Sequence, residues 1–243
     1  MINKQSSIPI YYQLAELIRE RLAAGEYVPG DMLPSEREFS DRYDISRMTV
    51  RQAITSLVNE GILHRKKGTG TFVSAPKINQ TLGGLTSFSE DMKARGLTPS
   101  NKLLRFEKVL CTRKDIRDIL NLTEEDYVYE IERVRLADNQ PMAIESIWLN
   151  ARFVPDLHRD IVQSSLYDYL EKEAGLVIGE ATQMLEASII SFEEAELLKV
   201  NKDAPVLMIE RHTYLQEGTP LEVVRSRYRA DRYRFSVDLP RLR

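Results

Sequence analysis

The sequence predicts an α+β protein of two domains, a small helical one followed by a larger one in which strands and helices alternate. Residues 10–61 contain three helix-like segments with capping residues, and a short strand pair follows them. Further along, a strand–turn–strand pattern at 131–146 is echoed at 209–226. The expected boundaries are a first domain at 1–74, a linker at 75–83 and a second domain at 84–243.

The composition is that of an ordinary globular protein, with 42% hydrophobic and 29% charged residues in 243. No apolar run approaches the ~20 residues that cross a bilayer. The N-terminus lacks the apolar segment of a signal peptide, so we expect a cytoplasmic protein. Cys111 is the lone cysteine in the sequence, which excludes an intrachain disulfide and agrees with a reducing compartment. The net charge of −3 argues against a nucleic-acid partner, but a basic face on a small domain can be hidden in that sum.

Three helices are expected in the first domain. Residues 10–24 carry an apolar stripe that Gly25 closes. Ser35 and Glu38 form an S-x-x-E capping box for a second helix. Ser46 is the expected N-cap of a third, which ends before Gly61. That third helix has an apolar side and a polar side from which Arg47 and Arg51 project. This arrangement, in which two helices and a tight turn precede a helix with an exposed polar face, indicates a helix-turn-helix.

A basic hairpin is expected after the third helix. Residues 62–65 and 71–73 have strand character, and 66–70 form the turn. Between 46 and 74 there are five basic residues and one acidic residue, Glu60. Alone, an arginine pair is usually a solvated helix face and a basic hairpin a plain turn. In this order they predict a surface for the major groove of DNA.

These segments resemble the winged helix-turn-helix of GntR-type bacterial transcription regulators. The resemblance rests on P-S-E-R-E (34–38), S-R-M-T-V-R-Q-A (46–53), L-V-N-E-G (57–61) and K-G-T-G-T-F-V (67–73). It implies that Arg37, Arg47, Thr49 and Arg51 contact phosphates or base edges. It also implies that the wing approaches the minor groove through Lys67, Gly68, Thr69 and Gly70.

The second domain is expected to begin with a helix at 86–96, with Ser87 and Glu90 as its capping box. The two echoed strand–turn–strand units each follow a helical segment, at 112–121 and 191–200. We interpret this as a duplicated helix–hairpin unit. Its copies are expected to pair into one antiparallel sheet about a pseudo-two-fold axis, with a cleft between them.

Arg133 and Arg135 lie two apart in the first echoed strand, so they share a face, roughly 7 Å apart along the strand. Two buried guanidinium groups need an anion or carboxylates opposite them. Glu145, on the return strand, is the partner for a purely structural ion pair. The alternative is an anion clamp, since arginine binds phosphate well, helped by helix N-termini near Ser87 and Ser165.

The second domain resembles the effector (UTRA) domain of the HutC-type branch of these regulators, which has a chorismate-lyase-like fold. The motifs are G-L-T-S-F-S-E-D-M, R-V-R-L-A-D, P-M-A-I-E-S, S-S-L-Y-D-Y, A-P-V-L-M-I-E-R and R-Y-R-A-D-R-Y, between about 84 and 236. Within that branch the sequence most resembles repressors of N-acetylglucosamine utilisation, which sense glucosamine-6-phosphate or N-acetylglucosamine-6-phosphate. The resemblance implies a phosphate site of Phe88, Ser89, Arg133, Arg135 and Ser165, and sugar contacts from Glu145, Tyr167, Glu222 and Tyr228.

Two other classes of function compete with this hypothesis. An enzyme on a lyase-like fold would need a catalytic group, and Glu145 with Glu222 is the one candidate acid–base pair. The three histidines show no metal-ligand spacing and there is no Cys-x-x-Cys, so no metal or cofactor is expected. An architectural DNA binder would spread basic charge widely, whereas here it is local.

We therefore expect a ligand-controlled transcriptional repressor and not an enzyme. Its partners would be a pseudo-palindromic double-stranded operator, a second copy of itself and an anionic effector, with no membrane. A sugar phosphate is the expected effector, and a different anionic metabolite is the alternative.

Overall fold

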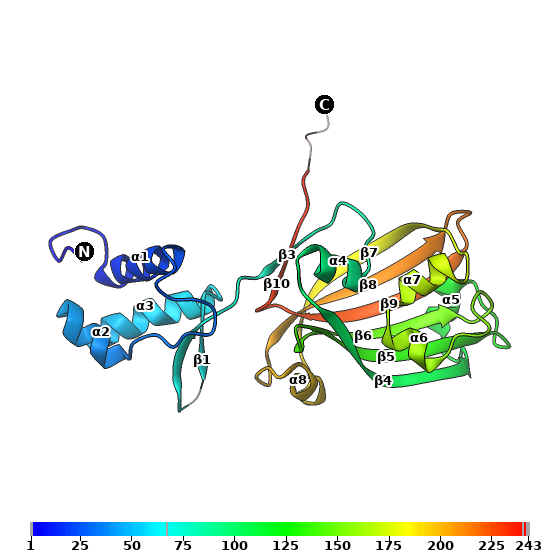
Figure 1. Cartoon of the computed structure of the whole chain (residues 1–243), viewed down its shortest axis with the longest axis horizontal. Coiled ribbons are helices and arrows are strands. Elements are labelled where there is room, and N and C mark those ends of the chain that lie inside the picture. The colour runs from blue at the N-terminus through cyan, green and yellow to red at the C-terminus, as the bar shows by residue number, and fades with distance from the viewer. Residues whose placement is uncertain (1, 67, 240, 242–243) are drawn as a thin grey trace. The chain divides into compact units, whose positions relative to one another are not determined.

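The computed structural model describes residues 2–66, 68–239 and 241, which form two compact units. The first runs to Ile78 and the second starts at Asn79, within the segment predicted as the linker. In Figure 1 the first unit runs from blue to cyan and the second from green to red. Each unit has an apolar core of its own, as separate domains do.

The first unit contains the three predicted helices. They are α1 (Ile10–Ala23), α2 (Glu36–Tyr43) and α3 (Arg47–Asn59). The Ser35 hydroxyl accepts from the Glu38 N–H, and the Glu38 carboxylate accepts from the Ser35 N–H, so the predicted capping box is present. Ser46 caps α3 by accepting from the Thr49 N–H. The helices enclose a core that includes Leu14, Ile18, Phe39, Val50, Ile54 and Leu57.

A short hairpin follows α3, as the sequence predicts. Strands β1 (Leu63–Lys66) and β2 (Gly70–Val73) are antiparallel. Leu63 and Val73 face each other at its base and join the helical core. At its tip Gly70 has a φ of +154°, and a Cβ there would lie 3.1 Å from the Met32 sulfur. The turn therefore requires glycine at this position.

The second unit is built on a six-stranded antiparallel sheet. Its spatial order is β4 (Pro99–Leu110), β5 (Tyr127–Ala137), β6 (Gln140–Asn150), β9 (Pro220–Arg229), β8 (Pro205–Leu215) and β7 (Ile178–Ile189). Helix α5 (Lys114–Leu120) joins β4 to β5, and α8 (Phe192–Leu198) joins β7 to β8. The two halves thus have one topology, and they meet where β6 pairs with β9 at Ile147 and Val224. This confirms the predicted duplication into one sheet.

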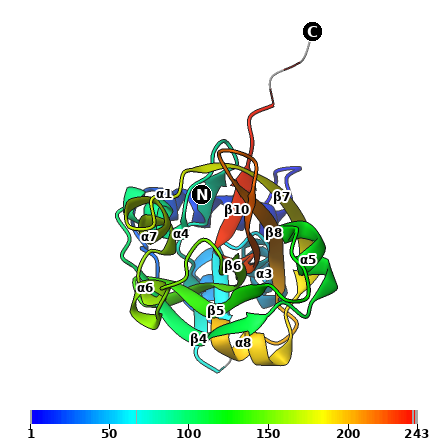
Figure 2. The ribbon, with the colours of Figure 1, turned by 90° about the vertical axis from the view of Figure 1, so that its right-hand side faces the viewer.

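Helices cover both faces of the sheet, and strand parity decides which side chains each face receives. Ile131 and Ile147 pack with α7 (Leu166–Lys172) and α6 (Arg159–Gln163) on one face. Val128 and Trp148 pack with α5 on the other, and α8 covers the same face farther along. Figure 2 shows α4 (Phe88–Ala94), α6 and α7 on one side of the sheet and α5 and α8 on the opposite side.

Part of the segment predicted as a linker forms a strand. β3 (Ile78–Thr81) pairs with β10 (Tyr233–Ser236) in a separate two-stranded sheet. Leu82 then donates its N–H to the Ser236 carbonyl at 2.7 Å. The segment is polar and has no alternation, so its strand character comes from the partner strand near the C-terminus and not from its own pattern.

Candidate DNA-binding surface and effector site

The outer side of α3 carries polar side chains over a shallow groove. Arg47, Arg51, Gln52 and Thr55 are exposed, and Met48 is 68% exposed. Met48, Arg51, Gln52 and Thr55 also line the groove, whose volume is about 540 Å³. Val50, Ala53, Ile54 and Leu57 are buried on the opposite side of the same helix, as predicted.

Arg51 does not extend freely from this surface. Its Nε and Nη2 lie 3.0 and 2.8 Å from Oε2 of Glu36, the first residue of α2. Arg65, on β1, also reaches Glu36 at 3.5 Å and donates to the Thr55 hydroxyl at 3.2 Å. Glu36 is thus shared by two arginines of the predicted DNA surface, a role that sequence reasoning missed.

The other residues predicted for DNA are placed at the ends of α2 and α3 and in the hairpin turn. Arg37 is exposed, and its contact with Asp41 is long at 3.7 Å. The Thr49 hydroxyl is hydrogen-bonded to the Ser46 hydroxyl at 2.8 Å, so it belongs to the cap of α3. Gly68, Thr69 and Gly70 are exposed in the turn, and Lys67 lies outside the described residues.

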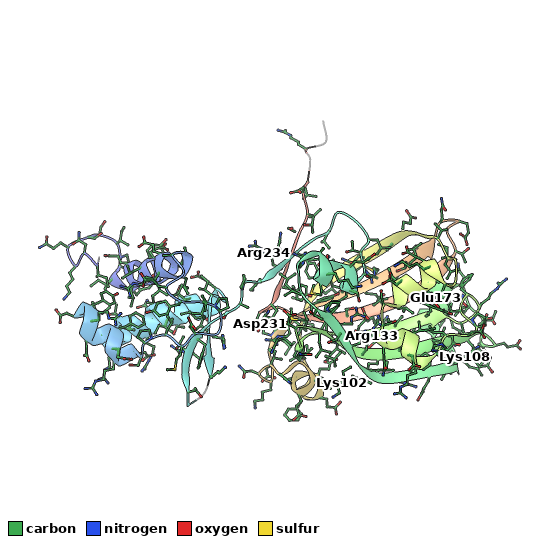
Figure 3. All side chains as sticks on the ribbon, viewed as in Figure 1. Lys102, Lys108, Arg133, Glu173, Asp231 and Arg234 are labelled. Carbon is green, nitrogen blue, oxygen red and sulfur yellow. The ribbon has the colours of Figure 1, made fainter. Side chains whose placement is uncertain are left out.

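In the second unit, Arg133 is tied to its neighbours. It extends from β5 beneath the helices (Figure 3), and only 4% of it is exposed. Its Nε donates to Glu145 Oε2 at 2.6 Å and its Nη1 to the Val162 carbonyl at 2.9 Å. Burial alone would raise the pKa of Glu145, but the cations of Arg133 and Arg135 outweigh it and lower that pKa to about 2. The structural ion pair considered from the sequence is therefore present for Arg133.

Arg135 is held more loosely in the same place. It is 3% exposed, its Nη2 donates to the Ser89 hydroxyl at 3.1 Å, and its guanidinium lies 4.5 Å above the Phe88 ring. The contact to Glu145 is long, at 3.6 Å. Its buried Nε has no hydrogen-bond partner among the described residues. The cation therefore lacks a full complement of acceptors among these residues. Burial and the nearby Arg133 lower the pKa of Arg135 to about 10.

A second group of polar side chains joins α7 to β8 and β9. The Tyr167 hydroxyl donates to Glu222 Oε1 at 2.6 Å, and the Thr213 hydroxyl donates to the same oxygen at 3.0 Å. Burial raises the pKa of Glu222. Its other oxygen, Oε2, is buried and accepts no hydrogen bond within the described part of the chain. Arg211 lies over the Tyr167 ring, 5.7 Å from its centroid.

These groups line two cavities that share walls. The first, about 20 Å³, is lined by eight of the predicted effector residues: Phe88, Ser89, Arg133, Arg135, Glu145, Ser165, Tyr167 and Glu222. Tyr228 lies instead in the second cavity, about 60 Å³, where its ring packs edge-on against Tyr233 at 4.8 Å. The two cavities share Phe88, Glu145, Arg211 and Val224. The first cavity brings the buried Arg133 and Arg135 and the half-buried Arg211 to the buried Glu145 and Glu222, and Asp91 lines the second cavity.

Arg211 lines both cavities, and sequence reasoning did not include it among the candidate effector residues. The signal was present in the repeat, since I-E-R occurs at 131–133 and again at 209–211. The duplicated sheet places Arg211 in the second half where Arg133 lies in the first, opposite Val224 instead of a carboxylate.

Comparison with known proteins assigns both units. Residues 10–73 match the model of the bacterial regulatory proteins of the gntR family, and residues 94–234 match the UTRA domain. The chain belongs to the GntR family of regulators and carries a UTRA domain. It is 48% identical to the HTH-type transcriptional repressor NagR of Bacillus subtilis (strain 168), over 99% of each chain. It is therefore a DNA-binding transcriptional repressor and not an enzyme.

Two further relatives support the assignment of the regulator. It is 33% identical to the mannosyl-D-glycerate transport/metabolism system repressor MngR of Escherichia coli (strain K12), over 94% of this chain and 95% of MngR. The crystal structure of PhnF from Mycobacterium smegmatis matches with a TM-score of 0.65 and 28% identity, over 93% of this chain and 98% of that one. These matches confirm the predicted winged helix-turn-helix and effector domain. Among the described residues, no helix is long and apolar enough to span a membrane.

Proposed function

We propose that the regulator senses a small phosphorylated amino sugar, glucosamine-6-phosphate or N-acetylglucosamine-6-phosphate. Binding in the second unit would change the affinity of the first unit for its operator and so control genes of amino-sugar uptake and catabolism. The observation that carries the proposal is the excess of cations at the smaller cavity, where three arginines (Arg133, Arg135 and Arg211) meet two glutamates (Glu145 and Glu222). In addition, the buried Nε of Arg135 has no acceptor among the described residues.

The cationic part of the site suits a phosphate. A buried guanidinium without its acceptors is unfavourable, and a phosphate supplies several acceptor oxygens at once. Arg135 and the Ser89 hydroxyl already lie within hydrogen-bond distance of each other. Ser165 lines the same cavity. Arg133, which already bonds to Glu145 and the Val162 carbonyl, would contribute positive charge from a fixed position.

The carboxylate part suits the hydroxyl or amino groups of a sugar. Glu222 has a buried oxygen that is ready to accept a hydrogen bond, and Glu145 lies in the wall common to both cavities. The rings of Tyr167 and Tyr228 supply flat surfaces on which a sugar ring packs. The resemblance to repressors of N-acetylglucosamine utilisation adds the identity of the sugar, which these groups alone do not specify.

On DNA, the regulator would act in the cytoplasm as a homodimer on a pseudo-palindromic operator, because two-fold proteins match two-fold sites. Arg37, Arg47, Thr49 and Arg51 would contact phosphates or base edges from α2 and α3. Lys67, Gly68, Thr69 and Gly70 would bring the wing to the minor groove. Effector binding would bias a two-state equilibrium through its different affinity for the two states.

The test is fluorescence anisotropy of the pure protein on its own upstream DNA, with glucosamine-6-phosphate titrated at fixed salt. Salt is fixed because phosphate contacts make DNA affinity strongly salt-dependent. A saturable change in operator affinity, absent with inorganic phosphate and with unphosphorylated glucosamine, supports the proposal. Tight operator binding that ignores the sugar phosphates refutes the effector and leaves the repressor assignment standing.

A second candidate is the same regulator with a different anionic effector. It is favoured by the 33% identity to a repressor of a mannosyl-D-glycerate system, since mannosyl-D-glycerate carries a carboxylate. Arginines bind carboxylates as well as phosphates. The same anisotropy assay with carboxylated sugars separates the two candidates.

A further inference from the structure

Glu36 is an acidic residue placed among the basic side chains of the predicted DNA surface. Its carboxylate accepts from Arg51 through Nε and Nη2, and it lies 3.5 Å from Arg65. A carboxylate here repels the DNA backbone and weakens attraction to every sequence. Because Glu36 weakens the affinity for DNA, we expect that it gives a benefit to the contact between Arg51 and DNA.

The geometry of the pair suggests that role. A guanidinium is a planar fork with five N–H donors. Glu36 takes the side edge of Arg51, formed by Nε and Nη2. The end edge, formed by Nη1 and the remaining N–H of Nη2, makes no hydrogen bond to the described residues, and the Arg51 side chain is 54% exposed. That end edge matches the O6 and N7 acceptors of guanine in the major groove.

We propose that Glu36 is a positioning residue for sequence readout. It fixes the plane of the Arg51 guanidinium so that the end edge meets a guanine and does not turn toward a phosphate. Glu36 thus lowers affinity for all DNA and raises the preference for the operator. The inference rests on the proposed role of Arg51 as a base-contacting residue.

The experiment compares Glu36→Asp and Glu36→Gln with the wild-type protein on operator DNA and on random DNA, at several salt concentrations. Glu36→Asp keeps the charge but withdraws the carboxylate by one carbon–carbon bond, which isolates orientation from electrostatics. We expect its affinity for random DNA and its salt dependence to stay unchanged. Its preference for the operator should fall about tenfold, the scale of one bidentate arginine–guanine contact.

Glu36→Gln removes the charge, so we expect stronger binding to random DNA, a steeper salt dependence and a loss of operator preference. Glu26→Gln is the matched control. Glu26, like Glu36, is paired with an arginine of the same unit, but it is more exposed and its partner, Arg21, lies on α1. This control should keep the wild-type preference. An unchanged operator preference in both Glu36 variants would overturn the proposal, because Glu36 would then act only as a repelling charge.

Arg51→Ala separates failure of the inference from failure of its premise. If Arg51→Ala keeps the wild-type operator preference, Arg51 does not read bases and the premise fails. If Arg51→Ala loses the preference while Glu36→Asp keeps it, Arg51 reads bases without help from Glu36. Thermal unfolding of each variant checks the fold, which should survive because the Ser35–Glu38 capping box still begins α2.

Discussion

Replacing Arg133 and Arg135 one at a time by methionine separates the two roles that a buried arginine pair can have. Both side chains are almost fully buried, so methionine fills most of the vacated volume in either case. Arg133 makes the 2.6 Å contact to Glu145 and a bond to a backbone carbonyl. Its loss leaves a buried carboxylate without its main partner, which costs about 3–5 kcal/mol of unfolding free energy.

Arg135→Met should cost much less. The variant loses one hydrogen bond to the Ser89 hydroxyl, worth about 1 kcal/mol, and a long contact to Glu145. Against this, the pKa of Arg135 is lowered from 12.5 to about 10, so its surroundings oppose the charged form by about 3 kcal/mol. Removing the cation relieves that opposition. We therefore expect the stability of the second unit to change little, while the response to glucosamine-6-phosphate is lost and operator binding is kept.

Trp148 makes the assay specific to the second unit, because it is the sole tryptophan in the sequence and lies on β6. Urea unfolding followed by its fluorescence should show a large loss for Arg133→Met and a small change for Arg135→Met. In thermal unfolding, Arg133→Met should lower Tm by about 10 °C, given about 2–4 °C per kcal/mol for a unit of this size. Equal destabilisation by the two variants would refute the reasoning, because Arg135 would then be as structural as Arg133.

Three more predictions follow from the same contacts. Arg51→Ala should reduce operator affinity at least tenfold, the scale of a lost bidentate base contact. Glucosamine-6-phosphate should still raise the Tm of the second unit in this variant. An unchanged operator affinity would contradict the proposed role of Arg51. Gly70→Ala should cost about 1–3 kcal/mol of strain in the wing, weakening DNA binding in anisotropy without moving the Trp148 unfolding transition. The pKa of Glu145 is about 2 in the folded protein against 4.5 in the unfolded chain. The ionised Glu145 therefore contributes fully to the free energy of unfolding above about pH 4.5, and this contribution is lost as the pH falls toward 2. Urea titrations between pH 5 and pH 3 should show the loss in the wild type and less of it in Glu145→Gln.

Local chemistry explains why much of the fold could be predicted from the sequence. Capping boxes at Ser35 and Ser87 depend on residues three apart, so they can be recognised without tertiary information. The shared face of Arg133 and Arg135 follows from strand parity alone. The echoed strands predicted the two-fold pairing because a duplicated unit that buries one face against its copy gives a single sheet.

What could not be predicted depends on contacts between distant segments. β3 forms because residues 78–81 meet β10, about 155 residues later, and their own pattern is neither alternating nor apolar. Glu36 reaches Arg51 because α2 crosses near α3, and helical periodicity within either helix does not give that crossing. Tyr228 lies in β9, two residues beyond the predicted strand–turn–strand unit, and packing against Tyr233 decides that its ring lines the second cavity.

The duplication also explains why the two sides of the proposed effector site differ chemically. Arg133 and Arg211 occupy matching places in the two halves, yet Arg133 faces Glu145 and Arg211 faces Val224. Two residues further along each strand, Arg135 in the first half corresponds to Thr213 in the second, and the Thr213 hydroxyl donates to Glu222. Two identical halves would recognise a symmetric ligand. Since the halves have diverged, the first contributes Arg133, Arg135 and Glu145, and the second contributes Arg211, Glu222 and Thr213. The extra guanidinium makes the first half the more cationic one, so in the proposed site the anion of the effector would bind there and its hydrogen-bond donors would meet Glu222.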